Sequence, residues 1–167
     1  MFAQTFIHAG GITEGPASEA HALQLVRRAF RRGHTVDATP EGGAVITWTA
    51  RRAVLGDVVE QGRSISLTPD TPIGEVTDAV RGYLLTLHTA PSAIPGVMDG
   101  RRVIRAGLQV IPAAATSHLF GRRLVVEEGG RVRLTLVARL ALLSLLTAAA
   151  PEDLAAIAEA DGVELPA

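Results

Sequence analysis

The fold class is decided by residues 34–68, which read HTVDATPEGGAVITWTARRAVLGDVVEQGRSISLT. Four short runs with strand character lie in this stretch, at 34–39, 44–49, 52–59 and 63–68. Two turn signals separate them in pairs, Pro40-Glu41-Gly42-Gly43 and Glu60-Gln61-Gly62. In the last run, Ile65 and Leu67 alternate with hydroxyl-bearing residues, a period of two typical of a sheet with one face in water. The stretch therefore predicts an antiparallel β-meander of two hairpins.

An amphipathic helix is expected directly before the meander, from Ser18 to about Arg32. Ser18 is a suitable N-cap and Gly33 a suitable C-cap. The core-facing stripe consists of Leu23, Val26 and Phe30. Residues 2–8 have strand character, and residues 9–16 have the Gly and Pro content of a loop. Residues 1–70 thus predict a two-layer α+β part, with a helix packed on an antiparallel β-meander.

Residues 71–167 predict a helical part that contains a β-hairpin, and the two parts are also compatible with one compact domain. A second helix is expected over 72–89, with Pro72 in its first turn. Residues 91–100 predict a loop and residues 103–111 a strand broken near Gly107. The remaining expected elements are a short helix over 112–121, a hairpin of 124–127 with 131–135, an apolar helix over 136–150 and a last short helix to about residue 160.

Charge is unevenly distributed along the chain, although the net charge is only -1. All 16 basic residues are arginines, a bias that codon usage in a GC-rich genome explains without any function. Residues 101–139 hold eight arginines and two glutamates, a formal charge of +6. Residues 151–167 hold five acids and no base. A basic segment of this kind favours phosphate-bearing partners, because arginine binds phosphate and guanine edges bidentately.

The segment PAAATSHLFGRRLVVEEGGRVRLT, residues 112–135, resembles the recognition helix and wing of winged-helix DNA-binding proteins, including MarR-type regulators. The resemblance covers about residues 103–146. It implies a small double-stranded DNA-binding protein, such as a transcriptional regulator, whose short helix enters the major groove while the wing contacts phosphates or the minor groove. The residues that it places at the DNA are Thr116, Ser117, His118, Arg122, Arg123, Arg131 and Arg133.

The segment departs from the winged-helix pattern at one point, since a strand is expected over 103–111 where a helix should precede the recognition helix. An ordinary helix-hairpin-helix with solvated arginines fits the same residues. The alternative function is a non-enzymatic interaction or assembly module that forms oligomers through apolar helices. The direction of the arginines distinguishes the two, because one shared basic surface favours DNA, whereas dispersed or acid-paired arginines favour assembly.

Catalytic signals are missing from the sequence, so no enzyme, cofactor or metal site is expected. The chain has no cysteine, no pair of its five histidines has zinc-ligand spacing, and no phosphate-binding glycine loop occurs. The N-terminus lacks a signal peptide, which predicts a cytoplasmic protein. The helix over 136–150 is short for a bilayer and contains Arg139, so it predicts a buried or subunit-interface helix of a homodimer and not a membrane span.

Overall fold

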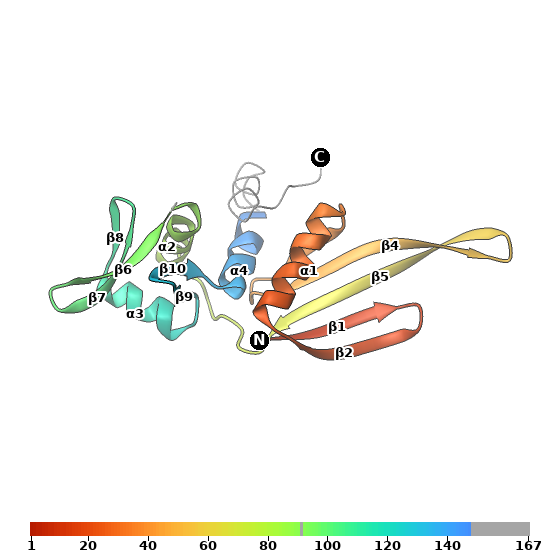
Figure 1. The fold of residues 1–167 in the computed structure, drawn as a ribbon, viewed down its shortest axis with the longest axis horizontal. Helices are drawn as coiled ribbons and strands as arrows, with labels where there is room; N and C mark the ends of the chain where they lie inside the picture. The colour runs from red at the N-terminus through yellow and green to blue at the C-terminus, as the bar shows by residue number, and fades with distance from the viewer. Residues whose placement is uncertain (91, 148–167) are drawn as a thin grey trace.

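The computed structural model of the protein describes residues 1–90 and 92–147. The chain forms an elongated α+β structure. A five-stranded sheet lies toward one end and a three-stranded sheet toward the other (Figure 1). The expected last helix and the acidic C-terminal segment lie outside the described residues. None of the helices in the described part of the chain has the length and apolarity needed to cross a bilayer.

The N-terminal half is an antiparallel five-stranded sheet with a helix on one face. The strand order is β2-β1-β5-β4-β3. The elements are β1 (Phe2–His8), β2 (Gly11–Ala17), α1 (Glu19–Arg31), β3 (Thr35–Ala38), β4 (Ala44–Val54) and β5 (Asp57–Pro69). Phe2, Ile46 and Leu67 from the sheet pack with Ala22 and Val26 of the helix in one buried cluster. The predicted α+β class, with a helix packed on an antiparallel sheet, is confirmed. The meander itself has three strands, β3, β4 and β5, and not the four expected over residues 34–68.

The start of α1 follows from local chemistry as the sequence predicts. The Ser18 hydroxyl accepts a hydrogen bond from the His21 amide at 3.1 Å, which satisfies one of the free N–H groups of the first turn. At the other end, Gly33 adopts a φ of 69°, a conformation that glycine allows at low cost. Both helix ends are therefore set by the predicted residues.

Two predictions in this half are wrong. Residues 11–16, expected as loop, belong to β2, and Pro16 is tolerated there because β2 is an edge strand whose outer side needs no N–H donor. The second hairpin turns at Leu55-Gly56 and not at residues 60–62, which pair with residues 49–51 inside a long ladder. Gly62 lies inside this ladder opposite Thr49, so a glycine in an exposed strand gives the same sequence signal as a turn.

The C-terminal half contains the remaining elements around a second buried cluster. They are α2 (Asp78–Thr89), β6 (Ala93–Met98), β7 (Arg101–Ala106), β8 (Gln109–Ile111), α3 (Ala113–Gly121), β9 (Val125–Glu128), β10 (Arg131–Leu134) and α4 (Leu136–Thr147). The strand near Gly107, the short helix and the third hairpin agree with the sequence predictions. The strands β6, β7 and β8 form one antiparallel sheet, and β9 and β10 a separate hairpin.

Two expectations in this half also need correction. The second helix starts at Asp78 and not near Pro72, because Thr77 caps it by accepting a hydrogen bond from the Val80 amide. The residues before it are held instead by the first half, since the Ile73 amide donates to the Glu41 carbonyl at 3.2 Å. Residues 93–98, expected as loop, form the edge strand β6, where Pro95 is again tolerated.

The helix α4 lies between the two halves (Figure 1). Leu136 and Leu140 belong to the N-terminal buried cluster, whereas Ala141 and Leu142 belong to the C-terminal one. Gly42 allows the β3–β4 turn to approach this helix closely, because any side chain there would collide with Val137. Burial against both halves of one chain thus explains why α4 is apolar on all sides. Residues 136–143 do not need a dimer partner to cover them.

Candidate functional site

The predicted helix and wing are present as α3, β9 and β10, followed by α4. The residues before α3 form β7 and β8, so the helix that a winged-helix domain places before its recognition helix is replaced by strands. The winged-helix arrangement is therefore not confirmed.

Thr116 is not available to DNA, which corrects the prediction for this residue. Its side chain is buried, with 1% of the residue exposed, and its hydroxyl donates to the Ile111 carbonyl at 3.1 Å. This hydrogen bond satisfies a buried polar group and fastens α3 to the end of β8. Ser117 and His118, the next two residues, are exposed.

Arg133 is held by two carboxylates of its own chain. Its Nη1 donates to Glu19 at 2.8 Å and its Nε to Glu128 at 2.5 Å. The hydrogen bond to Glu128 raises the pKa of Arg133, and the same bond lowers the pKa of the Glu128 carboxyl. Because Glu19 opens α1, Arg133 connects the hairpin to the N-terminal half, and a contact with phosphate would compete with these bonds.

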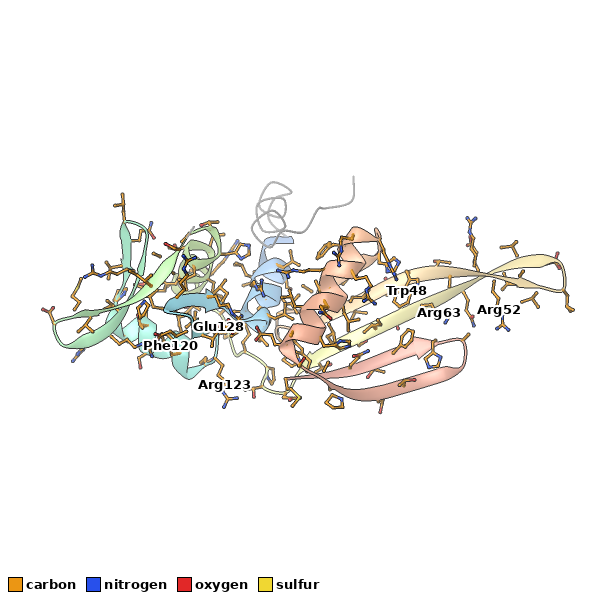
Figure 2. The ribbon with its side chains drawn as sticks, in the orientation of Figure 1. Trp48, Arg52, Arg63, Phe120, Arg123 and Glu128 are labelled. Carbon is orange, nitrogen blue, oxygen red and sulfur yellow. The ribbon has the colours of Figure 1, made fainter. Side chains whose placement is uncertain are left out.

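The other predicted arginines are exposed but lie in different surroundings. The Arg122 guanidinium lies against Gly74, in the segment between the two halves. Arg123 projects into solvent from the lower surface in Figure 2. Arg131 lines a hollow of about 440 Å³ together with Arg133 and Glu128.

Ser117 lies at another hollow, of about 550 Å³, beside β7 and α3. There Arg102 pairs with Glu127 and places its guanidinium 3.8 Å from the centre of the Phe120 ring. Both glutamates of the hairpin are therefore engaged by arginines, one by Arg102 and one by Arg133. Of the four arginines expected at DNA, Arg133 is thus paired with acids of the chain, whereas Arg122, Arg123 and Arg131 are exposed.

A feature that the sequence did not reveal is the long extension of the β4–β5 hairpin. The pairing of β3 with β4 ends at Thr47, and the pairing of β1 with β5 ends at Ser64. Beyond these points the two strands pair only with each other, so both outer edges are open. We call this extension, residues 49–62, the arm; it projects past the rest of the sheet (Figure 1).

Apolar side chains are exposed at the end of the arm. Leu55 is 100% exposed and Val58 is 68% exposed, with Val54 and Val59 also exposed. Leu55 has a φ of 51° and Gly56 a φ of 84°, so both central residues of the turn are left-handed. Asn or Gly takes the first of these positions more readily than Leu. The exposed leucine thus adds conformational cost and gains no burial within the chain.

The charges of the arm have both signs. Arg51 and Arg52 lie on β4, and Asp57 and Glu60 lie on β5. Arg51 and Glu60 form a cross-strand ion pair at 3.4 Å. Surfaces that follow nucleic-acid phosphates are strongly basic, and acids beside an apolar tip oppose insertion into anionic membranes. A partner protein that has an apolar surface with a charged rim fits the apolar end and the mixed charges of the arm better than nucleic acid or a membrane does.

Rings of four residues line the root of the arm. The ring centroids of His34 and Trp48 are 4.9 Å apart, those of Trp48 and Phe6 are 6.0 Å apart, and those of Phe6 and His8 are 4.9 Å apart. Burial, and next the charge of Arg32, lower the pKa of His34. Because the Trp48 ring stacks with both His34 and Phe6, it has less free face to offer a nucleic-acid base. Figure 2 shows Trp48 and Arg63 at this root and Arg52 farther along the arm.

Within residues 1–90 and 92–147, no three His, Asp or Glu side chains come close enough together to hold a metal ion. No protein-family model, curated protein or solved structure matches the chain.

Proposed function

We propose that the protein is a non-enzymatic interaction module that contacts its partner through the arm. The observation that carries this proposal is the exposed apolar end of the arm, formed by Val54, Leu55, Val58 and Val59. Full burial of one such side chain contributes about 1.5–3 kcal/mol, so a few of them support a specific contact after the entropic cost of association. The two open strand edges add backbone donors and acceptors that a partner strand can pair with.

The distribution of arginines supports the same proposal. Arg51, Arg102 and Arg133 are paired with acids of the chain, and Arg122 lies over Gly74. Arginines that are paired with acids of their own chain are expected of an interaction module, whereas a DNA-binding surface needs arginines that are free to contact phosphate.

Site-specific photo-crosslinking in the native cell tests this proposal. A photoreactive amino acid replaces Leu55 in one variant and Ile12 in a matched control, since Ile12 is also an exposed apolar residue near a hairpin end. We expect protein adducts from position 55 and few from position 12. Equal labelling at both positions, or no protein adduct from position 55, would rule the arm out as the contact element.

Double-stranded DNA binding is a second candidate, favoured by one observation. Arg122, Arg123 and Arg131 are exposed and form no ion pair within the described residues. Together with Ser117 and His118 they would contact the DNA backbone and base edges.

The test of this candidate is fluorescence anisotropy on mixed duplex DNA across a salt series. If the protein binds, Arg122→Glu, Arg123→Glu and Arg131→Glu together reduce the slope of log affinity against log salt by up to about 3. The matched control is Arg51→Glu with Arg52→Glu on the arm, which leaves this slope unchanged. An absence of binding at about 50 mM salt, where attraction is weakly screened, excludes the candidate.

A further inference from the structure

We propose that the solvent side of α1 binds the phosphate backbone of a double-stranded nucleic acid through a cluster of arginines. This cluster, which we call the arginine patch, consists of Arg27, Arg28, Arg31 and Arg32 at the end of α1 and Arg63 on β5. The patch is separate from the arm tip and from the unit formed by α3, β9 and β10. The inference therefore goes beyond the proposed function and adds a second contact surface to the protein.

The geometry of α1 places its four arginines away from the sheet. Val26 is buried in the cluster between the helix and the sheet. Because each residue turns a helix by about 100°, Arg28 lies on the opposite side from Val26. Arg31 and Arg32 flank Arg28, and all three are exposed, whereas Arg27 is half-buried. The last turns of α1 thus present a solvent face made of arginines.

Arg63 adjoins this face through two aromatic rings. His34 follows the helix directly, and its amide donates to the Ala29 carbonyl at 2.9 Å. The His34 ring stacks on Trp48, and Trp48 is the cross-strand partner of Arg63. After burial, the charge of Arg32 is the second cause of the lowered pKa of His34, which shows that the two side chains are close. The patch therefore continues from the helix onto the sheet.

Acids of the chain do not neutralise the arginine patch. None of its five arginines forms an ion pair within the described residues. The sequence contains no acid between Glu19 and Asp37, and Glu19 binds Arg133. Asp37 points to the other face of the sheet, because its neighbour Val36 packs on the N-terminal buried cluster. The patch therefore keeps its positive charge although the net charge of the chain is -1.

This positive charge is unfavourable in the free protein. The four helical arginines form two pairs at a spacing of four residues, where like charges repel. The Nε atoms of Arg27 and Arg63 are buried and have no hydrogen-bond partner in the part of the chain that the structure describes. The helix dipole favours cations at the end of α1, but its effect does not extend to Arg63 on β5. A bound anion would offset both the repulsion and the loss of solvation.

The composition of the patch favours a nucleic acid among anionic partners. Neither α1 nor β3 has an exposed large apolar residue. Protein interfaces have an apolar core, and membrane-bound helices insert an apolar face, whereas the apolar face of α1 is buried against the sheet. Interfaces with nucleic acid are polar and strongly basic. Because Trp48 already stacks with His34 and Phe6, contact with duplex phosphates is favoured over stacking of single-stranded bases.

Fluorescence anisotropy with a mixed-sequence DNA duplex across a salt series tests the patch. The test variant carries Arg28→Gln, Arg31→Gln and Arg32→Gln, because these residues are exposed and glutamine is a good helix former. At about 50 mM salt we expect it to bind at least about tenfold more weakly than the wild type. The slope of log affinity against log salt should fall by about 2 to 3, the loss of three phosphate contacts. Its urea midpoint should be no lower than that of the wild type, because repelling charges are removed.

Lysine at the same three positions separates charge from structure. This variant should bind within about threefold of the wild type, because attraction to phosphate depends mainly on charge. The matched control removes the same charge from exposed residues outside the patch, by Arg52→Gln, Arg101→Gln and Arg105→Gln. The control should also bind like the wild type. Equal loss in the control and the test variant, or a lysine variant as weak as the glutamine variant, would overturn the inference.

The other possible partners and the other basic surface are tested in the same assay. Poly-L-glutamate and vesicles that contain phosphatidylserine are added as competitors at equal charge concentration, and we expect neither to displace the duplex as well as unlabelled duplex does. Equal displacement by either competitor, or no duplex binding at about 50 mM salt, would overturn the inference. So would binding that is lost in the variant with glutamate at positions 122, 123 and 131 and retained in the α1 variant. Each of these failures leaves the crosslinking test of the arm unaffected.

Discussion

Arg133 shows how one side chain can join distant parts of this chain. It binds Glu19 from the start of α1 and Glu128 from the β9–β10 hairpin. We predict that Arg133→Met raises the pKa of Glu128 toward its ordinary value, because both the hydrogen bond and the charge that lower it are removed. NMR titration of the Glu128 carboxyl measures this shift. An unchanged pKa would show that the contact with Arg133 is not formed in solution.

His34 should make stability depend on mildly acidic pH. Burial and Arg32 lower its folded-state pKa, so the unfolded chain takes up a proton more readily. The contribution of neutral His34 is therefore complete above its ordinary pKa of about 6.5 and is lost as the pH falls below that value. We predict that His34→Phe, which keeps a ring beside Trp48, reduces the loss of stability between pH 7.5 and 5.5. Urea midpoints at both pH values test it, and an identical loss in the variant would contradict it.

At the scale of elements, the Leu55-Gly56 turn should be more stable with a different first residue. Asn tolerates the left-handed conformation that Leu55 adopts. We predict that Leu55→Asn increases the free energy of unfolding by up to about 1 kcal/mol while it weakens the contact made by the arm. Chemical denaturation measures the first effect and crosslinking from position 58 the second. A Leu55→Asn variant that is less stable than the wild type, and that crosslinks from position 58 as strongly as the wild type does, would contradict this role of Leu55.

The helices and hairpins could be predicted where local signals determine them. Ser18 and the apolar stripe of α1 define that helix, and Gly129-Gly130 define the hairpin turn near the predicted place. Predictions failed where the sheet overrode local composition. Pro16 and Pro95 suggested loops, yet both lie in edge strands that do not need their missing N–H group.

The candidate site was less predictable than the fold. The arm depends on where the neighbouring strands β1 and β3 stop, which is a property of the sheet and not of residues 49–62. The burial of Thr116 likewise depends on how α3 packs, and the Ile111 carbonyl accepts the hydrogen bond of its buried hydroxyl. Charge along the sequence also could not show that Arg133 meets Glu19, 114 residues away.

At the scale of the whole molecule, α4 should make the two halves unfold together. Leu140 is buried in the N-terminal cluster, and Leu142, half a turn farther along, is buried in the C-terminal cluster. We predict that Leu140→Ala lowers the free energy of unfolding by about 2–5 kcal/mol. Trp48 fluorescence reports on the first half and hydrogen exchange of β7 amides on the second, and both should lose stability together. Loss confined to the first half would show that the halves are independent.

The position of α4 near the end of the described chain also has a consequence for synthesis on the ribosome. The five strands of the first sheet are complete at Pro69, but Leu136 and Leu140, which close the cluster beneath that sheet, are translated 67 or more residues later. Until α4 has been translated, the nascent N-terminal half exposes the apolar surface that Leu136 and Leu140 cover in the folded protein. A chain that stalls before α4 should therefore be a substrate for chaperones and proteases, whatever partner the finished arm binds.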